Sequence, residues 1–233
     1  MDLVYFPVRD AIDNCIDDGI VGTNDGETIE DELWIHYHHL RRICEILKEH
    51  KLVLDPKKCD FFTRRVEFCG HILENCTKRP APGKLLAVER WPPPKNVTEM
   101  RAFLGFANYY STYVPEFARM AAPLMDKLKV RRVLGKKGTK HPIYLSESDL
   151  QNFHDLKSAL VSGLSLHAVN PDAPFVLRVD ASDREIGAVL EQLPNAQRPI
   201  TPAETLEKKT IPVAFMSRKL THGQAKRWSV REK

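Results

Sequence analysis

The first third of the chain shows two hydrophobic patterns, one typical of a hairpin of strands and, after it, one typical of a helix. Apolar residues stand on both sides of Asp17-Asp18-Gly19, which predicts two short strands joined by a turn at these residues, because turns tolerate Asp and Gly. From Thr28 the apolar residues follow helical spacing, and Thr28 with Asp31 forms a capping-box pattern. The predicted apolar face is Leu33, Tyr37, Leu40, Ile43, Cys44 and Leu47.

Short apolar runs come next. Residues 52–54 and residues 66–73 each predict a strand, and Asp55-Pro56-Lys57-Lys58 between them predicts a turn. Gly70 lies inside the second run, where a glycine indicates a close approach by another backbone.

The middle of the chain returns to helical spacing. A helix is predicted over residues 83–89, and Trp91-Pro92-Pro93-Pro94 ends it because prolines cannot continue a helix. Asn96 or Thr98 caps a second helix, and residues 117–128 predict a third. The pattern therefore predicts a small helical bundle.

The last third changes from helix to strand. Ser146 and Asp149 predict the cap of one more helix, and the apolar pattern then predicts a meander of three strands over residues 175–180, 186–190 and 213–217. Helices and strands in separate runs indicate an α+β fold.

Composition narrows the function classes only a little. The 233 residues are 42% hydrophobic with a net charge of +4, which permits a nucleic-acid partner without requiring one. Five cysteines, with no Cys-x-x-Cys pair, indicate reduced thiols. No apolar run reaches membrane-spanning length and no signal-peptide pattern follows Met1, so we expect a soluble intracellular protein of the cytoplasm or nucleus, with no membrane partner.

Two clusters of polar residues are candidates for a metal-binding site. Asp17 and Asp18 are adjacent, and Mg²⁺ is the usual cation that binds carboxylates together with substrate phosphates, although an isolated Asp-Asp-Gly is more often a solvated turn. His36, His38 and His39 lie on the first predicted helix, but no carboxylate or cysteine completes a site there. A solvated or packing role is therefore favoured for the three histidines.

A series of short motifs favours a functional role for Asp17 and Asp18 over a solvated turn. Together the motifs resemble the polymerase of gypsy-type long-terminal-repeat retrotransposons, in the same order and at similar spacing over nearly the whole chain. They are Ile16-Asp17-Asp18, His36-x-x-His39-Leu40-Arg41, Asp55-Pro56-Lys57-Lys58-Cys59, Val66-Glu67-Phe68-Cys69-Gly70-His71, Trp91-Pro92, Phe103-Leu104-Gly105, Asn108-Tyr109-Tyr110, Ala122-Pro123-Leu124, Val179-Asp180-Ala181-Ser182, Gly187-Ala188-Val189-Leu190 and Ser217-Arg218-Lys219-Leu220.

The resemblance implies a role for each part of the chain. Residues 1–82 would be the C-terminal part of a reverse-transcriptase palm, in which Asp17 and Asp18 are catalytic metal ligands. Cys15 stands where the family usually has an aromatic residue. The primer grip, a hairpin that positions the end of the growing strand, would consist of Phe68, Cys69, Gly70 and His71.

Beyond residue 82 the resemblance implies three further parts. They are a thumb over residues 83–128, a basic linker and connection over residues 129–172, and the truncated N-terminal part of an RNase H-like domain over residues 173–233. Asp180 would be the first catalytic and metal-binding carboxylate of the RNase H-like domain. The expected cofactor is Mg²⁺, used by the two-metal route, and the full-length parent would also bind dNTP.

Basic residues suggest where a duplex would bind. The candidates for contact with the backbone of an RNA:DNA hybrid or another duplex are Lys95, Arg101, Arg131, Arg132, Lys136 and Lys137. The alternative is that the basic run is only a solvated linker.

The resemblance also indicates what is missing. A third polymerase carboxylate would lie before Met1, and a second RNase H carboxylate would follow Lys233, so we expect both active sites to be incomplete and this chain alone to be inactive. Three hypotheses follow: part of an RNA-directed DNA polymerase with ribonuclease H, a non-catalytic remnant or domesticated nucleic-acid-binding protein, or a structural module without nucleic acid.

Overall fold

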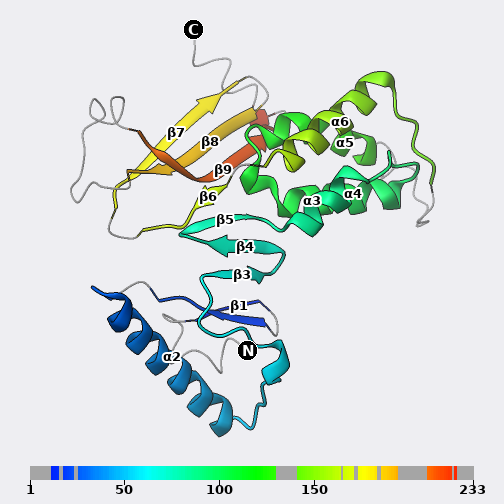
Figure 1. Cartoon of the computed structure of the whole chain (residues 1–233). Helices are drawn as coiled ribbons and strands as arrows, with labels where there is room; N and C mark the ends of the chain where they lie inside the picture. The colour runs from blue at the N-terminus through cyan, green and yellow to red at the C-terminus, as the bar shows by residue number, and fades with distance from the viewer. Residues whose placement is uncertain are drawn as a thin grey trace. The chain divides into compact units, whose positions relative to one another are not determined.

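The computed structural model places most of the chain in two compact units. It describes residues 12–15, 18–23, 26–129, 141–163, 165–170, 173–182, 185–193, 209–221 and 223–224. Unit 1 is Met1–Asn75 and unit 2 is Cys76–Lys233. Figure 1 shows both units, with unit 1 in blue and cyan.

Unit 1 begins with a two-stranded antiparallel ribbon. Strands β1 (Ile12–Cys15) and β2 (Asp18–Val21) pair so that Ile12 lies opposite Val21 and Cys15 opposite Asp18. The predicted hairpin is confirmed, but the prediction that Asp18 and Gly19 lie in the turn is wrong, because both are strand residues. This register places Ile12 and Val21 against Ile43 and Leu47 in the small core of the unit.

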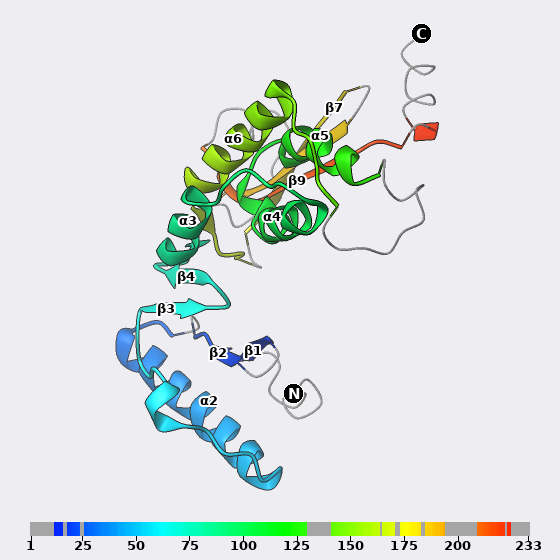
Figure 2. The same cartoon turned by 90° about the vertical axis from the view of Figure 1, so that its right-hand side faces the viewer.

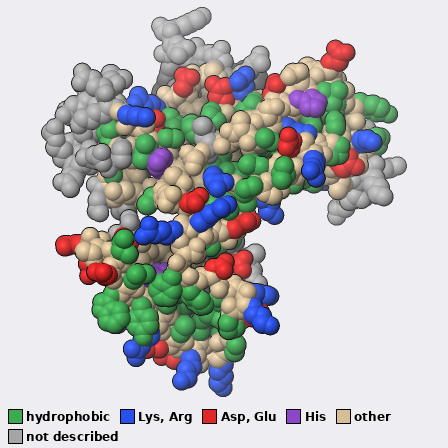
Figure 3. Space-filling model, viewed as in Figure 1, with side chains coloured by type: hydrophobic (Ala, Val, Ile, Leu, Met, Phe, Trp, Pro, Cys, Tyr) green, Lys and Arg blue, Asp and Glu red, His purple; other side chains and the backbone are tan. Residues whose placement is uncertain are grey.

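Helix α2 (Ile29–Glu49) has the predicted start and only half of the predicted apolar face. The hydroxyl of Thr28 accepts from the N–H of Asp31, and the Asp31 carboxylate accepts from the N–H of Thr28, both at 3.2 Å. Ile43 and Leu47 are buried, whereas Leu33 and Tyr37 are exposed. Ile29 and Trp34 are exposed as well. Figure 3 shows hydrophobic side chains gathered on the surface of unit 1.

The predicted strand over residues 52–54 does not form. The N–H of Leu52 donates to the carbonyl of Leu47, and Lys51 has φ of 56°, so the chain reverses as α2 ends. Residues 52–54 have no strand partner among the described residues, and Asp55 instead caps a short 3₁₀ turn (Pro56–Lys58) through the N–H of Lys57.

The predicted strand over residues 66–73 is a hairpin. Strands β3 (Arg65–Phe68) and β4 (His71–Glu74) pair with Phe68 opposite His71. Cys69 and Gly70 form the turn with φ of 48° and 76°, and two positive φ values in a two-residue connection are the mark of a type I′ turn. Gly70 therefore allows a reversal, and the prediction of one continuous strand was wrong for this reason.

Unit 2 is built on a helical core. Helices α3 (Pro82–Glu89), α4 (Val97–Tyr109), α5 (Phe117–Lys129) and α6 (Glu147–Val161) pack together as Figure 2 shows. The predicted cap Asn96 accepts from the N–H of Glu99 at 3.0 Å. The fully buried side chains at the centre of this core include Met100, Phe103, Leu124, Phe153 and Leu156.

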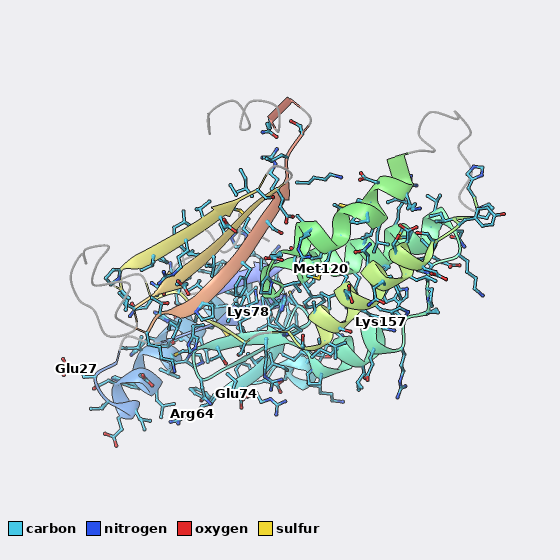
Figure 4. All side chains as sticks on the ribbon, turned by 90° about the horizontal axis from the view of Figure 1, so that it is seen from above. Glu27, Arg64, Glu74, Lys78, Met120 and Lys157 are labelled. Atoms are coloured by element: carbon cyan, nitrogen blue, oxygen red, sulfur yellow. The ribbon has the colours of Figure 1, made fainter. Side chains whose placement is uncertain are left out.

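Helix α6 is joined to the other helices by polar as well as apolar contacts. The capping box of Ser146 and Asp149 is confirmed. Asp149 also binds Lys127 of α5, with 2.6 Å between Oδ2 and Nζ. Lys157, labelled in Figure 4, donates to the carbonyl of Trp91 at 2.9 Å. The proline-rich segment after α3 is thereby held against α6.

The sheet of unit 2 is the predicted antiparallel meander. Its strands are β7 (Phe175–Ala181), β8 (Glu185–Gln192) and β9 (Ile211–Lys219), and a register shift interrupts the β8–β9 pairing at Leu190/Glu191. Strand β9 lies beside α5, and Phe215 packs on the helical core. A short pair, β5 (Thr77–Pro80) with β6 (Leu166–His167), completes the unit.

Candidate functional site

A cleft in unit 1 gathers residues from the ribbon, from α2 and from the β3 region. We call it the hairpin cleft; it encloses about 320 Å³ and its lining includes Asp18, Gly19, His36, Phe61, Phe62 and Phe68. Asp18 is an exposed residue at the start of β2. Asp18 and Phe68, which the sequence assigned to the polymerase centre and to the primer grip, therefore line one cleft. Asp17 lies outside the described residues.

His36 is a polar side chain that lines the hairpin cleft. Its Nδ1 lies 2.9 Å from Oγ1 of Thr23, and its ring makes a T-shaped contact with Phe62, with 5.3 Å between the ring centroids. Burial lowers the pKa of His36 below its ordinary value, and nearby His39 lowers it further. The folded chain therefore favours the neutral imidazole, and Nδ1 of His36 is engaged by Thr23.

The predicted primer-grip residues form the tip of the β3–β4 hairpin. Phe68 and His71 flank the turn, and Cys69 and Gly70 occupy it. His71 is buried, which is unusual for a histidine and indicates a side chain that fixes the hairpin. Of the four residues, Phe68 lines the hairpin cleft.

A second cleft lies in unit 2, where the meander meets the start of α5. We call it the sheet cleft; it encloses about 280 Å³ and its lining includes Glu116, Arg178, Asp180, Glu185, Gly187 and Ser217. Asp180 is exposed near the end of β7 and lies opposite Gly187 of β8. Since glycine has no side chain, the strand opposite Asp180 leaves its carboxylate open to the cleft.

Acidic groups from separate elements meet at the sheet cleft. Burial raises the pKa of Glu185; the Arg119 guanidinium opposes this effect and the Glu116 carboxylate adds to it. Glu116 is itself paired with Arg119, with 2.6 Å between Oε2 and Nη2. The sequence analysis did not identify Glu116 or Glu185, and no motif marks Glu116, because it reaches the cleft only through the packing of α5 beside β9.

The predicted phosphate-binding residues are described only in part. Lys95 and Arg101 are exposed, at the break before α4 and on α4 itself. Arg131, Arg132, Lys136 and Lys137 lie outside the described residues. In the described part of the chain, no helix is both long and apolar enough to cross a membrane.

A magnesium site can be tested against the donor atoms. The described residues contain no group of three Asp, Glu, His or Cys side chains placed to hold a metal ion. Mg²⁺, however, is often bound by one or two carboxylates together with waters and substrate phosphates. The exposed carboxylates of Asp18 and Asp180 fit that mode, in which the substrate completes the coordination.

Comparison with known proteins bears directly on the sheet cleft. Residues 145–233 match the family described as the RNase H-like domain found in reverse transcriptase. The chain is 35% identical over 179 residues to the retrovirus-related Pol polyprotein from transposon opus, and 32% identical over 169 residues to that from transposon gypsy, both of Drosophila melanogaster. The chain is homologous to retrotransposon Pol polyproteins. These alignments cover 76% and 71% of the chain but only 17% and 16% of the two polyproteins.

The fold is also similar to that of solved structures. A foamy viral protease-reverse transcriptase in complex with double-stranded DNA matches with a TM-score of 0.72 and 17% identity, over 97% of this chain and 35% of that one. The same kind of protein in complex with an RNA/DNA hybrid matches with a TM-score of 0.71 and 18% identity, over 97% of this chain and 27% of that one. This mixed fold of helices and antiparallel strands thus resembles that of the foamy viral enzyme.

Proposed function

We propose that this chain is the part of a retrotransposon RNA-directed DNA polymerase that runs from the end of the palm, through the thumb and connection, into the RNase H-like domain. The proposed ranges are residues 1–82, 83–128, 129–172 and 173–233. The observation that carries the polymerase part is that Asp18 and Phe68 line one cleft although 50 positions separate them. The matched RNase H-like domain, with Asp180 on its sheet cleft, supports the nuclease part.

The proposed substrate is an RNA:DNA hybrid, and dNTP in the full-length parent. In the hairpin cleft, Phe68 would position the primer end beside Asp18, and in the sheet cleft Asp180 would face the scissile phosphate. Bound Mg²⁺ would supply Lewis-acid stabilisation of the phosphoryl transition state at each carboxylate. Asp17 is proposed as the second polymerase ligand. The foamy viral complexes with double-stranded DNA and with hybrid make a duplex a reasonable partner.

The test separates the two activities in a Pol polyprotein that contains this chain. Asp18→Asn should reduce primer extension by about a thousandfold, because losing a metal ligand costs several kcal/mol of transition-state stabilisation, and should leave hybrid cleavage intact. Asp180→Asn should reduce hybrid cleavage and leave primer extension intact. If either variant retains full activity in both assays, the assigned role of that carboxylate is wrong.

Duplex binding has its own test in the chain itself. Replacing Lys95 and Arg101 by Ala, together with Arg131, Arg132, Lys136 and Lys137, should weaken binding of a labelled hybrid. It should also flatten the salt dependence of binding by roughly 0.9 logarithmic units for each phosphate that is no longer neutralised, the slope known for B-form DNA. Lys48→Ala with Lys51→Ala, two exposed lysines at the end of α2, is the control. An unchanged salt slope in the six-residue variant would contradict the proposed phosphate binding.

The alternative function is a nucleic-acid-binding protein without catalysis. The exposed cations Lys95 and Arg101 favour duplex binding, which this alternative keeps. Binding that persists together with two inactive assays in the unmodified polyprotein would select this alternative.

A further inference from the structure

One wall of the hairpin cleft has features that the proposed placement of a primer end does not use. Segment 59–63 forms one wall, and two of its residues, Phe61 and Phe62, are 52% and 55% exposed although they line the cleft. Exposed neighbouring phenylalanines are costly in water, and an aromatic ring that borders a cleft offers a surface on which a planar ligand can stack.

The backbone holds one of these rings in a strained conformation. Phe62 has φ of 55°, a left-handed conformation that is unfavourable in a residue with a Cβ. Such outliers persist where the surrounding structure requires them, and they are concentrated at ligand-binding sites. In this conformation the Phe62 ring makes a T-shaped contact with the His36 imidazole.

His36 supplies a hydrogen-bonding group in the same cleft as Phe61 and Phe62. Its Nδ1 is engaged by Thr23, and within the described part of the chain Nε2 has no hydrogen-bond partner. If the hydroxyl of Thr23 donates to Nδ1, Nε2 carries the proton and is available to donate to a ligand. A neutral imidazole beside aromatic rings suits the polar edge of a heteroaromatic ring.

The charges in and around the cleft indicate where the phosphate of a ligand would lie. The exposed cations Lys57, Lys58, Arg64 and Arg65 stand on both sides of segment 59–63, and Arg64 is labelled in Figure 4. The carboxylates that line the cleft are Asp18, Asp60 and Glu67. A phosphate would be repelled from the carboxylates and attracted to the flanking cations, so a ligand that places a planar base inside and a phosphate at the rim is complementary.

We propose that the wall formed by Phe61, Phe62 and His36 is a binding site for a single unpaired nucleobase. The base stacks on the exposed phenylalanines, the Nε2 of His36 hydrogen-bonds its edge, and the phosphate lies toward the four cations. The base can come from a free nucleotide or from an unpaired position in a strand. This wall belongs to the same cleft as Asp18. Binding of a base on it does not depend on polymerase activity.

The experiment uses the whole chain and 2-aminopurine, an adenine analogue whose fluorescence is quenched by stacking. The probe is placed in a single-stranded DNA and in the blunt duplex of the same sequence, and adenosine monophosphate serves as competitor. We expect quenching with the single strand and little with the duplex, in which the base is already paired. Competition by the monophosphate would assign the site to free nucleotides, and its failure would assign it to an unpaired base of a strand; both results support the site.

Variants test the named residues. Phe61→Ala, Phe62→Gly and His36→Ala should each weaken binding of the single strand, on the order of tenfold for a lost stacking ring. Phe62→Gly is the sharpest variant because glycine accepts the positive φ, so the fold keeps or gains stability while the ring is removed. Tyr144→Ala removes an exposed aromatic ring in unit 2, 82% exposed, and should change nothing.

Two results would overturn the inference: unchanged quenching in both Phe62→Gly and His36→Ala, or equal quenching by single strand and duplex. A chain that binds hybrid with the expected salt slope but fails to quench the probe would retain the proposed function and lose this site. A chain that quenches the probe but does not bind hybrid would retain this site and contradict the proposed duplex binding.

Discussion

Ser217 in β9 accepts a hydrogen bond from the backbone N–H of Ala118 in α5, with 2.7 Å between Oγ and N. Ala118 is the second residue of its helix, where N–H groups have no partner inside the helix. A strand residue 99 positions later therefore caps α5. Lys219, two residues further along β9, pairs with Asp126 of α5 at 2.6 Å. The helices and the sheet of unit 2 are joined by these contacts together with Phe215.

The first prediction concerns this cap. Ser217→Ala should lower the free energy of unfolding by about 1 kcal/mol, the usual effect of losing a helix cap. Lys219→Ala is the matched control on the same strand; both partners of its ion pair are about half exposed, so it should cost no more than about 0.5 kcal/mol. Thermal unfolding of the three proteins gives the comparison. Equal losses in the two variants would show that Ser217 does not act as a cap.

Local signals in the sequence anticipated much of this structure, and long-range contacts account for most of what they missed. Thr28, Asn96 and Ser146 act on N–H groups within three residues of themselves, so their caps could be predicted. The cap from Ser217 could not, since only folding brings it to α5. The hairpin cleft combines both cases: the Asp18 motif is local, whereas the place of His36 in the cleft depends on how α2 packs under β1 and β2.

The strand prediction over residues 66–73 failed for a different reason. Hydrophobic alternation continues through Cys69 and Gly70, so the period alone cannot reveal a reversal. Positive φ at both positions makes the turn, and only Gly70 is a residue type that signals it. Cys69 adopts the same conformation at a cost that its sequence context does not show.

The second prediction follows from this turn. Cys69→Gly should raise the free energy of unfolding by about 1 kcal/mol by relieving a left-handed residue with a Cβ, and Gly70→Ala should lower it by a similar amount. Urea unfolding under reducing conditions measures both changes. Cys44→Ala, at an exposed position of α2, controls for the loss of a thiol. Destabilisation by Cys69→Gly would show that contacts of the thiol outweigh the backbone strain.

The third prediction concerns the ion pair between Asp149 and Lys127. Burial alone would raise the pKa of Asp149, but hydrogen bonds from Lys127 and Ser146 outweigh burial and hold the pKa below its ordinary value. A lowered pKa in the folded state adds stability above the unfolded-state pKa, and this contribution is lost as the pH falls through the folded-state value. Stability should therefore decline below about pH 4.

Asp149→Asn tests that assignment. The variant should lose about 1–3 kcal/mol at pH 7, as expected for hydrogen bonds to a charged group, and should lose little more on acidification. Asp155→Asn on the same helix removes an exposed carboxylate, bonded to Gln151, and should retain the acid-dependent loss. Chemical unfolding from pH 7 to pH 3 gives the curves. Parallel pH profiles for Asp149→Asn and the unsubstituted chain would exclude Asp149 as the source.

The last prediction concerns His36 and the ribbon that carries Asp18. Because burial and His39 lower the pKa of His36 in the folded state, the folded chain favours the neutral imidazole. The sign follows from linkage: the contribution is complete above the unfolded-state pKa of about 6.5 and is lost as the pH falls through the lower folded-state value. The protection of the β1 and β2 amides against hydrogen exchange, taken relative to the intrinsic exchange rate at each pH, should therefore fall below about pH 6.5. His36→Gln cannot titrate and should remove this loss of protection, whereas His50→Gln, at the exposed end of α2, should retain it. If His36→Gln retains the loss of protection, protonation of His36 does not control the ribbon.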